Sequence, residues 1–385
     1  MIKNKLSALA GCAVLALGLA ACGSSSSTNS TSTSTSSSSS SASSTPSTTA
    51  TATSTAPGTI SGAGSTFAAP VYEQWASELS SAGLTVNYQS VGSGAGITAL
   101  ESKTVDFGAS DPPLKPADEE AIAKNGSTAV EIPMFIGAIT VSYNLPGVKT
   151  GLKLDGKTIA DIYLGKVTKW NDSEIAALNP GVTLPSTAIT VIHRSDSSGT
   201  TSGFTGFLAA VDPEFLSKVG EGKEVQWPVG TGAKGNAGVA GAVQQTVGAV
   251  GYVEQAYALE HKFTYAAIKN KAGAFVEPTL ESASAAAQGV MVPANLGIKI
   301  KNPAGAGSYP ITSQTFVVVS KDMCKAGIPG GEGAAKGVAQ FLAYGLGKGQ
   351  SVLSQADYAA LPAAILAKSK EAVAGLQCNG APLAG

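Results

Sequence analysis

AITVIHRSDSSGTTSGFTGFLAAV, residues 188–211, is the stretch that decides the fold class of this chain. It opens with an apolar segment of strand composition and then passes through a turn rich in serine, threonine and glycine. In the segment that follows, Phe204, Phe207, Leu208 and Val211 lie on one side of a helix. The stretch therefore predicts a strand that leads through a short turn into a helix, the repeating unit of α/β proteins.

The same alternation continues through the rest of residues 58–385. Further strands are expected at 59–64, 84–92, 104–110, 138–145 and 311–320, and further helices at 66–83, 94–103, 332–344 and 363–376. We therefore expect an α/β fold with mixed, mostly parallel sheets and helices on both faces. Because this part of the chain is large for one sheet, we expect two lobes.

The composition narrows the classes of function. A formal net charge of −1 gives no global field that would attract nucleic acid, so no nucleic-acid partner is expected and anion recognition must be local. The chain has two histidines, His193 and His261, and no group of cysteine and histidine with the spacing of a zinc site. We expect neither a metal nor a cofactor.

The first 57 residues predict export and anchoring. Lys3 and Lys5 precede an apolar run at 6–21, which suits a signal peptide better than a membrane-spanning helix. The run ends in LAACG, which resembles a bacterial lipobox, so residues 1–22 are expected to be a lipoprotein signal with Cys22 as the lipidated residue. The alternative is ordinary signal cleavage beside an incidental cysteine.

Residues 23–57 are almost wholly serine, threonine and alanine, so we expect a disordered tether. A lipid anchor and a tether place the protein on the outer face of the cell membrane. In that oxidising compartment Cys324 and Cys378 form a plausible disulfide, although two separate buried thiols are the alternative.

Three turns rich in glycine and hydroxyl side chains, at 62–67, 92–96 and 197–201, each lie between an expected strand and an expected helix. The first N–H groups of a helix have no partner within it, and its macrodipole places partial positive charge there. Such a turn is suited to bind an anion. For a single turn the simpler interpretation is an N-cap. Three similar turns, with Arg194 beside the third, instead predict a set of neutral donors around an oxyanion.

Asp111 ends one of the expected strands, and a carboxylate there would repel an anion unless the anion carries a proton. Phosphate keeps a proton near neutral pH, and a carboxylate accepts it, whereas sulfate has none to give. Asp111 is therefore predicted to select phosphate over sulfate. The alternative is a turn residue before two prolines. Asp196 either orients Arg194 or caps the following helix, and the sequence leaves both roles open.

Seven motifs together resemble the phosphate-binding proteins of phosphate-specific ABC transporters. They are GAGSTFAAPVY (62–72), YQSVGSGAG (88–96), TVDFGASDPPL (104–114), LDGKTIADIYLGKVTKWND (154–172), HRSDSSGT (193–200), ITSQTF (311–316) and DYAALP (357–362). They occur in the order of the family and cover nearly all of residues 58–385. Ser90 and Ser197 stand where relatives often have glycine, and neither change removes a ligand.

The resemblance implies a type II periplasmic-binding-protein fold in which two lobes, joined by crossover strands, enclose inorganic phosphate. Lobe I would comprise residues 58–138 and 311–385, and lobe II residues 139–310. The closed, monomeric protein would deliver phosphate to the permease. The implied phosphate-binding residues are Thr66, Phe67 through its backbone N–H, Ser93, Asp111, Arg194, Ser198, Gly199 and Thr200.

Enzymatic readings are less well supported. A serine hydrolase needs a positioned base, and His193 should point away from the side that Arg194 faces. A secreted phosphatase would need a metal cluster or a histidine nucleophile, so we expect no enzyme. Another oxyanion or an organophosphate is the alternative ligand.

Two nucleotide-binding patterns are interpreted as chance matches. One is the P-loop pattern at 151–158, where Asp155–Gly156 indicates a tight turn. The other is the dinucleotide fingerprint at 230–235, with Glu254 downstream.

Overall fold

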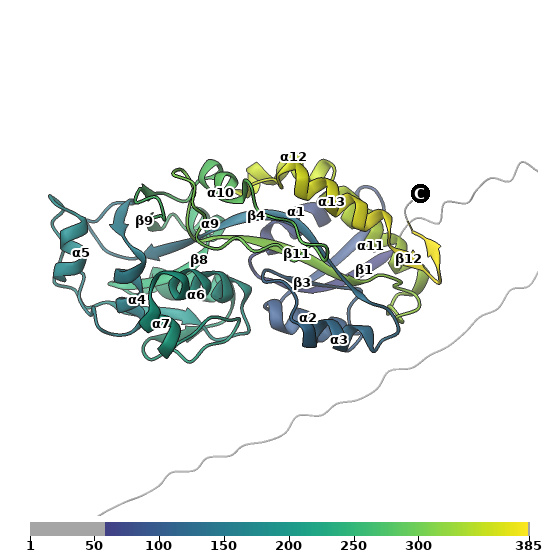
Figure 1. Cartoon of the computed structure of the whole chain (residues 1–385), viewed down its shortest axis with the longest axis horizontal. Coiled ribbons are helices and arrows are strands. Elements are labelled where there is room, and N and C mark those ends of the chain that lie inside the picture. Colours follow the sequence, from purple (N-terminus) through teal and green to yellow (C-terminus); the bar gives the residue numbers. More distant parts are fainter. Residues whose placement is uncertain (1–57, 384–385) are drawn as a thin grey trace, which may run out of the picture. The chain divides into compact units, whose positions relative to one another are not determined.

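Two long strands, β4 (Ala129–Tyr143) and β11 (Thr312–Ser320), join the sheet of this protein across its middle (Figure 1). The structure is a computed structural model that describes residues 58–383. The predicted signal peptide (1–22), its lipidation site Cys22 and the predicted tether (23–57) lie outside the described residues. No helix within 58–383 is long and apolar enough to span a bilayer.

The order of elements follows the alternation that the sequence predicts. The other strands are β1 Thr59–Gly64, β2 Thr85–Ser90, β3 Phe107–Ser110, β5 Leu152–Leu154, β6 Thr190–Arg194, β7 Thr231–Ala233, β8 Ala249–Glu254, β9 Thr264–Lys269, β10 Phe275–Val276, β12 Gln377–Cys378 and β13 Ala381–Pro382. The helices are α1 Ala69–Ser80, α2 Ser93–Glu101, α3 Pro116–Ala123, α4 Gly156–Tyr163, α5 Ser173–Leu178, α6 Gly199–Val211, α7 Pro213–Lys218, α8 Gly235–Gln245, α9 Gln255–Glu260, α10 Leu280–Ala287, α11 Gly331–Gly345, α12 Lys348–Val352 and α13 Ala363–Ala374.

The main sheet runs in the order β2-β1-β3-β11-β4-β8-β6-β7, with β9, β10 and β5 attached beside it. β1 pairs in parallel with β2 and β3, and β6 pairs in parallel with β7 and β8. β11 and β4 connect these two groups through antiparallel pairing. Helices lie on both sides of the strands, with α12 and α13 above and α2, α3 and α6 below in Figure 1. The expected mixed α/β fold is confirmed.

β4 is longer than the strand that the sequence predicts at 138–145. It begins at Ala129 and includes Pro133, which cannot donate a hydrogen bond to a neighbouring strand. The register shifts at this point, because Phe316 faces Pro133 whereas Thr315 faces Phe135. Such a β-bulge accommodates proline within a central strand. The prediction was therefore wrong at its start, since a proline in the sequence interrupts the strand signal.

The partner of β4 changes along its length. Residues up to Ala138 pair with β11, and residues from Ile139 onward pair with β8. The predicted boundary between the lobes falls at this position. The two lobes stay a prediction, because the described residues 58–383 fall within a single compact unit.

The P-loop pattern at 151–158 has a different local structure from the one we expected. Asp155 is the N-cap of α4, and its side chain accepts a hydrogen bond from the Thr158 backbone N–H at 2.9 Å. The prediction of a tight turn at Asp155–Gly156 was therefore wrong. Because β5 lies inside the pattern rather than before it, no loop is left to surround a phosphate.

Each of the predicted anion turns lies at the carboxyl end of a parallel strand. β1 ends before the turn that opens α1, β2 before α2, and β6 before α6. α6 begins at Gly199 because Ser198 is its N-cap, with its hydroxyl accepting a bond from the Thr201 N–H at 3.0 Å. Open α/β sheets bind ligands at these strand ends, so the fold brings the turns into a suitable place.

Cys324 and Cys378 form a disulfide that ties the segment after β11 to the short strand β12. Their separation of 54 residues closes a long loop. We expect that replacing both cysteines with serine lowers the free energy of unfolding by about 4 kcal/mol, according to the chain-entropy treatment of cross-links. Urea unfolding in phosphate-free buffer measures this change. Reductant should produce the same loss in the unmodified protein, and equal midpoints in all three samples would contradict the bridge.

Candidate functional site

Asp111, at the end of β3, is buried within a group of hydroxyl side chains. Its Oδ1 accepts hydrogen bonds from Ser65 Oγ at 2.5 Å and Thr315 Oγ1 at 2.9 Å. Its Oδ2 has a longer contact, 3.4 Å, with Ser93 Oγ. Burial raises the pKa of Asp111 to about 6, although the three hydroxyls and Arg194 act in the opposite direction. Oδ2 is thus the oxygen with the greater remaining capacity to accept a proton.

Gly199 brings the α6 turn directly against this carboxyl group. A Cβ atom at position 199 would lie 2.1 Å from Asp111 Oδ2 and 2.4 Å from Ser93 Oγ. No side chain fits there, so glycine permits the approach. A second contact joins the same turns, because the Gly94 N–H donates to the Ser197 carbonyl at 2.9 Å. Residues that lie about a hundred positions apart in the sequence therefore share one site.

Arg194, the last residue of β6, is held by two carboxylate bonds. Its Nε donates to Asp196 Oδ1 at 2.7 Å, and its Nη2 donates to Asp196 Oδ2 at 2.5 Å. Its Nη1 donates to Thr200 Oγ1 at 3.2 Å. Burial alone would raise the pKa of Asp196, but the bonds from Arg194 hold it below its usual value. Of the two roles left open for Asp196, the geometry shows contact with the guanidinium, while Ser198 caps α6.

Thr66 and Thr200 are joined through a residue that the sequence analysis did not select. Asn236 Nδ2 donates to Thr66 Oγ1 at 2.9 Å and to Thr200 Oγ1 at 3.2 Å. Asn236 lies in the first turn of α8 and is fully buried. Its turn, at 230–235, was set aside as a chance nucleotide fingerprint. A strand end followed by glycine and a helix start was nevertheless the signal that could have identified it.

Backbone donors complete the group. Within residues 58–383, the N–H groups of Phe67, Gly199 and Thr200 donate to no protein acceptor. The eight residues that the resemblance implies as phosphate ligands are all buried. They are Thr66, Phe67, Ser93, Asp111, Arg194, Ser198, Gly199 and Thr200. Buried N–H groups without acceptors are costly. Their convergence near Asp111 and Arg194 suits an enclosed oxyanion.

Glu254 and Tyr358 form a second buried contact near Phe67. Tyr358 Oη lies 2.5 Å from the Phe67 carbonyl oxygen and 2.7 Å from Glu254 Oε2. Burial raises the pKa of Glu254 well above its usual value. From the sequence, Glu254 was interpreted only as the acid of the nucleotide fingerprint. Its position at the end of β8, fully buried, is inconsistent with binding a ribose.

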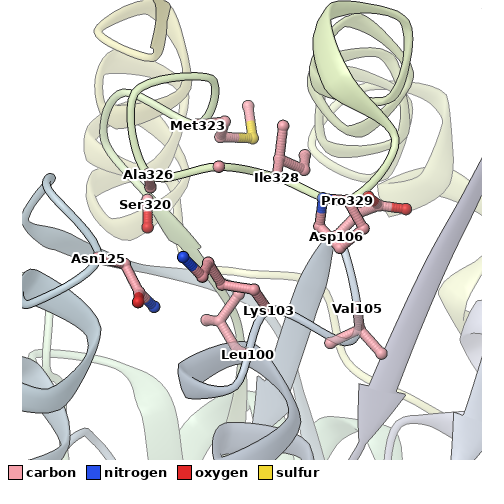
Figure 2. A pocket seen from close by; sticks show the side chains of 11 residues that line it. Leu100, Lys103, Val105, Asp106, Asn125, Ser320, Met323, Ala326, Ile328 and Pro329 are labelled. Atoms are coloured by element: carbon pink, nitrogen blue, oxygen red, sulfur yellow. The ribbon is translucent and has the colours of Figure 1, made fainter.

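Away from the Asp111 site, the described residues offer few groups for catalysis or metal binding. His193 stacks on Trp227 with ring centroids 5.3 Å apart. Its ring therefore packs on that indole and not on the hydroxyl side chains that surround Asp111. No cluster of potential metal ligands occurs in the described part of the chain. A cavity of about 20 Å³ is lined by none of the predicted anion ligands. Figure 2 shows the side chains that line it. Its acid, Asp106, already accepts bonds from the Ser61 N–H and hydroxyl and from the Gly330 N–H.

Comparisons with known proteins identify relatives of this chain by sequence. Residues 49–345 match the model of the PBP superfamily domain. The chain is 42% identical over 316 residues to "Phosphate-binding protein PstS" of Haemophilus influenzae, covering 81% of this chain and 91% of that protein. It is 42% identical over 314 residues to the protein of the same name from Pasteurella multocida, covering 80% of this chain and 88% of that one.

Solved structures show the same fold at lower identity. A DING protein aligns with a TM-score of 0.66 at 20% identity, over 84% of this chain and 99% of that chain. A high-affinity periplasmic phosphate-binding protein bound with phosphate aligns with a TM-score of 0.65 at 21% identity, over 81% and 93% of the two chains. These two likenesses concern the fold alone.

The raised pKa of Asp111 predicts a pH dependence of stability. Below about pH 4 both the folded and unfolded states carry the proton. Between about pH 4 and 6 the unfolded chain ionises first, so the free energy of unfolding falls as pH rises, by about 3 kcal/mol in all. We expect the Asp111→Asn variant to lack this loss, since asparagine still accepts the bonds from Ser65 and Thr315.

Urea titrations of both proteins at pH 4 and pH 8, without phosphate, measure this difference. Wild type should be destabilised relative to the variant only at the higher pH. A constant difference between the two proteins at both pH values would show that Asp111 titrates normally.

Proposed function

Because the chain belongs to the family of phosphate-binding proteins within the PBP superfamily, we propose that it captures inorganic phosphate for import by an ABC transporter. It is a substrate-binding protein that acts outside the cytoplasm, and the permease of the uptake system is its partner. The observation that carries this function is the meeting of buried donors with Asp111 and Arg194 at one site.

The donors and the acid have complementary roles in this proposal. Oxyanion oxygens accept from the N–H groups of Phe67, Gly199 and Thr200, from hydroxyls and from Arg194. Asp111 Oδ2 accepts the proton that phosphate keeps near neutral pH. Sulfate lacks that proton and would place two unsatisfied charged oxygens in contact. The site thereby distinguishes two anions of nearly equal size.

Closure of two lobes encloses the anion in this proposal. One lobe comprises 58–138 and 311–385, the other 139–310, and β4 and β11 cross between them. Several hydrogen bonds and one ion pair join residues on the two sides. Tyr257 Oη donates to the Thr66 carbonyl at 2.8 Å, and Lys223 Nζ lies 3.8 Å from Asp118 Oδ2. These contacts fit a closed form that is competent to dock on the permease.

Thermal unfolding with phosphate, sulfate and a phosphomonoester tests the ligand. At about 100 times its dissociation constant, phosphate should stabilise the protein by roughly 2.7 kcal/mol. Sulfate and the ester should have no comparable effect, and no phosphate should be released from the ester. Stabilisation by sulfate would favour another oxyanion, and hydrolysis of the ester would favour an enzyme.

The Asp111→Asn variant tests the selection mechanism. Its amide no longer requires a protonated ligand, so the ratio of sulfate to phosphate affinity should rise by about tenfold or more, on the scale of one hydrogen bond to a charged group. Isothermal titration with both anions gives the ratio. An unchanged ratio in a folded variant would rule out proton acceptance by Asp111.

The anchor is proposed from the sequence alone. Cys22 would carry lipid and residues 23–57 would tether the binding unit to the outer face of the membrane. We expect the Cys22→Ser variant to move from the membrane fraction to the medium, with unchanged phosphate affinity. Mass spectrometry of the mature N-terminus should show acyl chains on Cys22. A free thiol there, or an N-terminus elsewhere, would disprove the anchor.

A further inference from the structure

We propose that Asn236 is a positioning residue that turns the hydroxyl protons of Thr66 and Thr200 toward the bound anion. The inference rests on the proposed function, because it assumes that both threonines contact phosphate. It adds a residue from the α8 turn, outside the three turns that the sequence singles out. Three observations support it: the hydrogen-bonding capacity of each hydroxyl, the fixed orientation of the amide, and the place of Asn236 between two sides of the site.

The first observation concerns Thr66. A threonine hydroxyl can accept two hydrogen bonds and donate one. Thr66 Oγ1 accepts from the Asn236 backbone N–H at 3.2 Å and from Asn236 Nδ2 at 2.9 Å. Both acceptor positions are therefore filled by one residue. The single proton of Thr66 must point elsewhere, and no hydrogen bond within residues 58–383 uses it.

Thr200 has the same arrangement with a different second donor. Its Oγ1 accepts from Arg194 Nη1 at 3.2 Å and from Asn236 Nδ2 at 3.2 Å. Its acceptor capacity is also full, and its proton has no protein acceptor among the described residues. The two hydroxyls can therefore act only as donors. A buried donor needs an acceptor, and an oxyanion supplies one for each.

The amide of Asn236 has one orientation that fits its surroundings. Its Oδ1 accepts from the Glu254 backbone N–H at 3.1 Å. Turning the amide over would place two donors, Nδ2 and the Glu254 backbone N–H, against each other at that contact, so the Glu254 N–H fixes the orientation. Nδ2 is thus directed at Thr66 and Thr200, and full burial prevents water from replacing it.

Asn236 also joins the two predicted lobes. Thr66 follows β1, whereas Asn236 and Thr200 belong to α8 and α6. Opening the site would break the contact with Thr66 and release its hydroxyl to rotate. The donor geometry is therefore assembled only on closure, which makes anion affinity and closure depend on each other.

A double-mutant cycle tests whether Asn236 acts through a hydroxyl. Thr66→Val removes the donor, and Asn236→Ala removes the group that orients it. Each single change should weaken phosphate binding by about 10- to 100-fold, the range for one hydrogen bond to a charged group. If Asn236 acts through Thr66, the Thr66→Val change should cost much less when alanine already stands at 236. Titration calorimetry gives the four dissociation constants.

A second variant keeps the test independent of folding defects. Asn236→Asp preserves the shape and still accepts the Glu254 N–H, but it can no longer donate to the threonines. The Thr66 hydroxyl should then donate to this carboxylate, so Thr66→Val should again have little further effect. As a matched control, Asn179→Asp alters another buried asparagine, whose Nδ2 donates to the Lys153 and Ile175 carbonyls. It should lower the melting temperature without changing the phosphate dissociation constant.

The outcomes separate this inference from the proposed function. Wild type that binds phosphate with coupled effects at 66 and 236 supports both. If the wild type binds phosphate but the effects of the substitutions at 66 and 236 on its dissociation constant simply multiply in both cycles, the role of Asn236 is overturned and the proposed function stands. Wild type that shows no phosphate binding in calorimetry overturns the proposed function, and with it the inference.

Discussion

The burial of hydrogen-bond donors that lack protein acceptors is the constraint on which the site depends. The fold ends β1 and β6 at turns whose N–H and O–H groups are buried away from water. Unsatisfied buried donors are costly, so this arrangement is favourable only with an acceptor-rich ligand between them. In the proposed function, the stability of the buried site and its affinity for an oxyanion therefore arise from the same hydrogen bonds.

Charge plays a smaller part in this site than the presence of Arg194 suggests. Asp196 binds the guanidinium through two hydrogen bonds, so the pair is close to neutral as a unit. Asp111 adds a group whose ionisation burial makes unfavourable, with its pKa raised to about 6. Attraction to any anion is thus weak at long range, which agrees with the net charge of −1. In the proposed function, selection comes instead from matching each donor and acceptor to one protonation state of the ligand.

The sequence predicted the α/β class and the turns at 62–67, 92–96 and 197–201, because strand patterns and glycine-rich helix starts are local signals. It did not predict Asn236: the strand end, glycine and helix start at 231–236 mark a turn, but they do not show that its asparagine donates to two distant threonines. The contacts of Ser65 and Thr315 with Asp111 were not predicted either. They join residues 46 and 204 positions apart in the sequence, respectively, and no local pattern indicates such contacts. The start of β4 was missed because Pro133 is tolerated only through a bulge that depends on its partner strand.

Glu254 shows how the site is connected to the strands that cross the molecule. Glu254 lies at the end of β8. Its backbone N–H donates to Asn236 Oδ1, and its carboxyl group contacts the Tyr358 hydroxyl. Tyr358 Oη lies 2.5 Å from the Phe67 carbonyl oxygen and 2.7 Å from Glu254 Oε2, and the same carboxyl oxygen accepts a hydrogen bond from the Ala256 N–H at 2.8 Å. Burial raises the pKa of Glu254 well above its usual value. One buried residue thereby holds both the asparagine that orients the threonines and the peptide segment at Phe67.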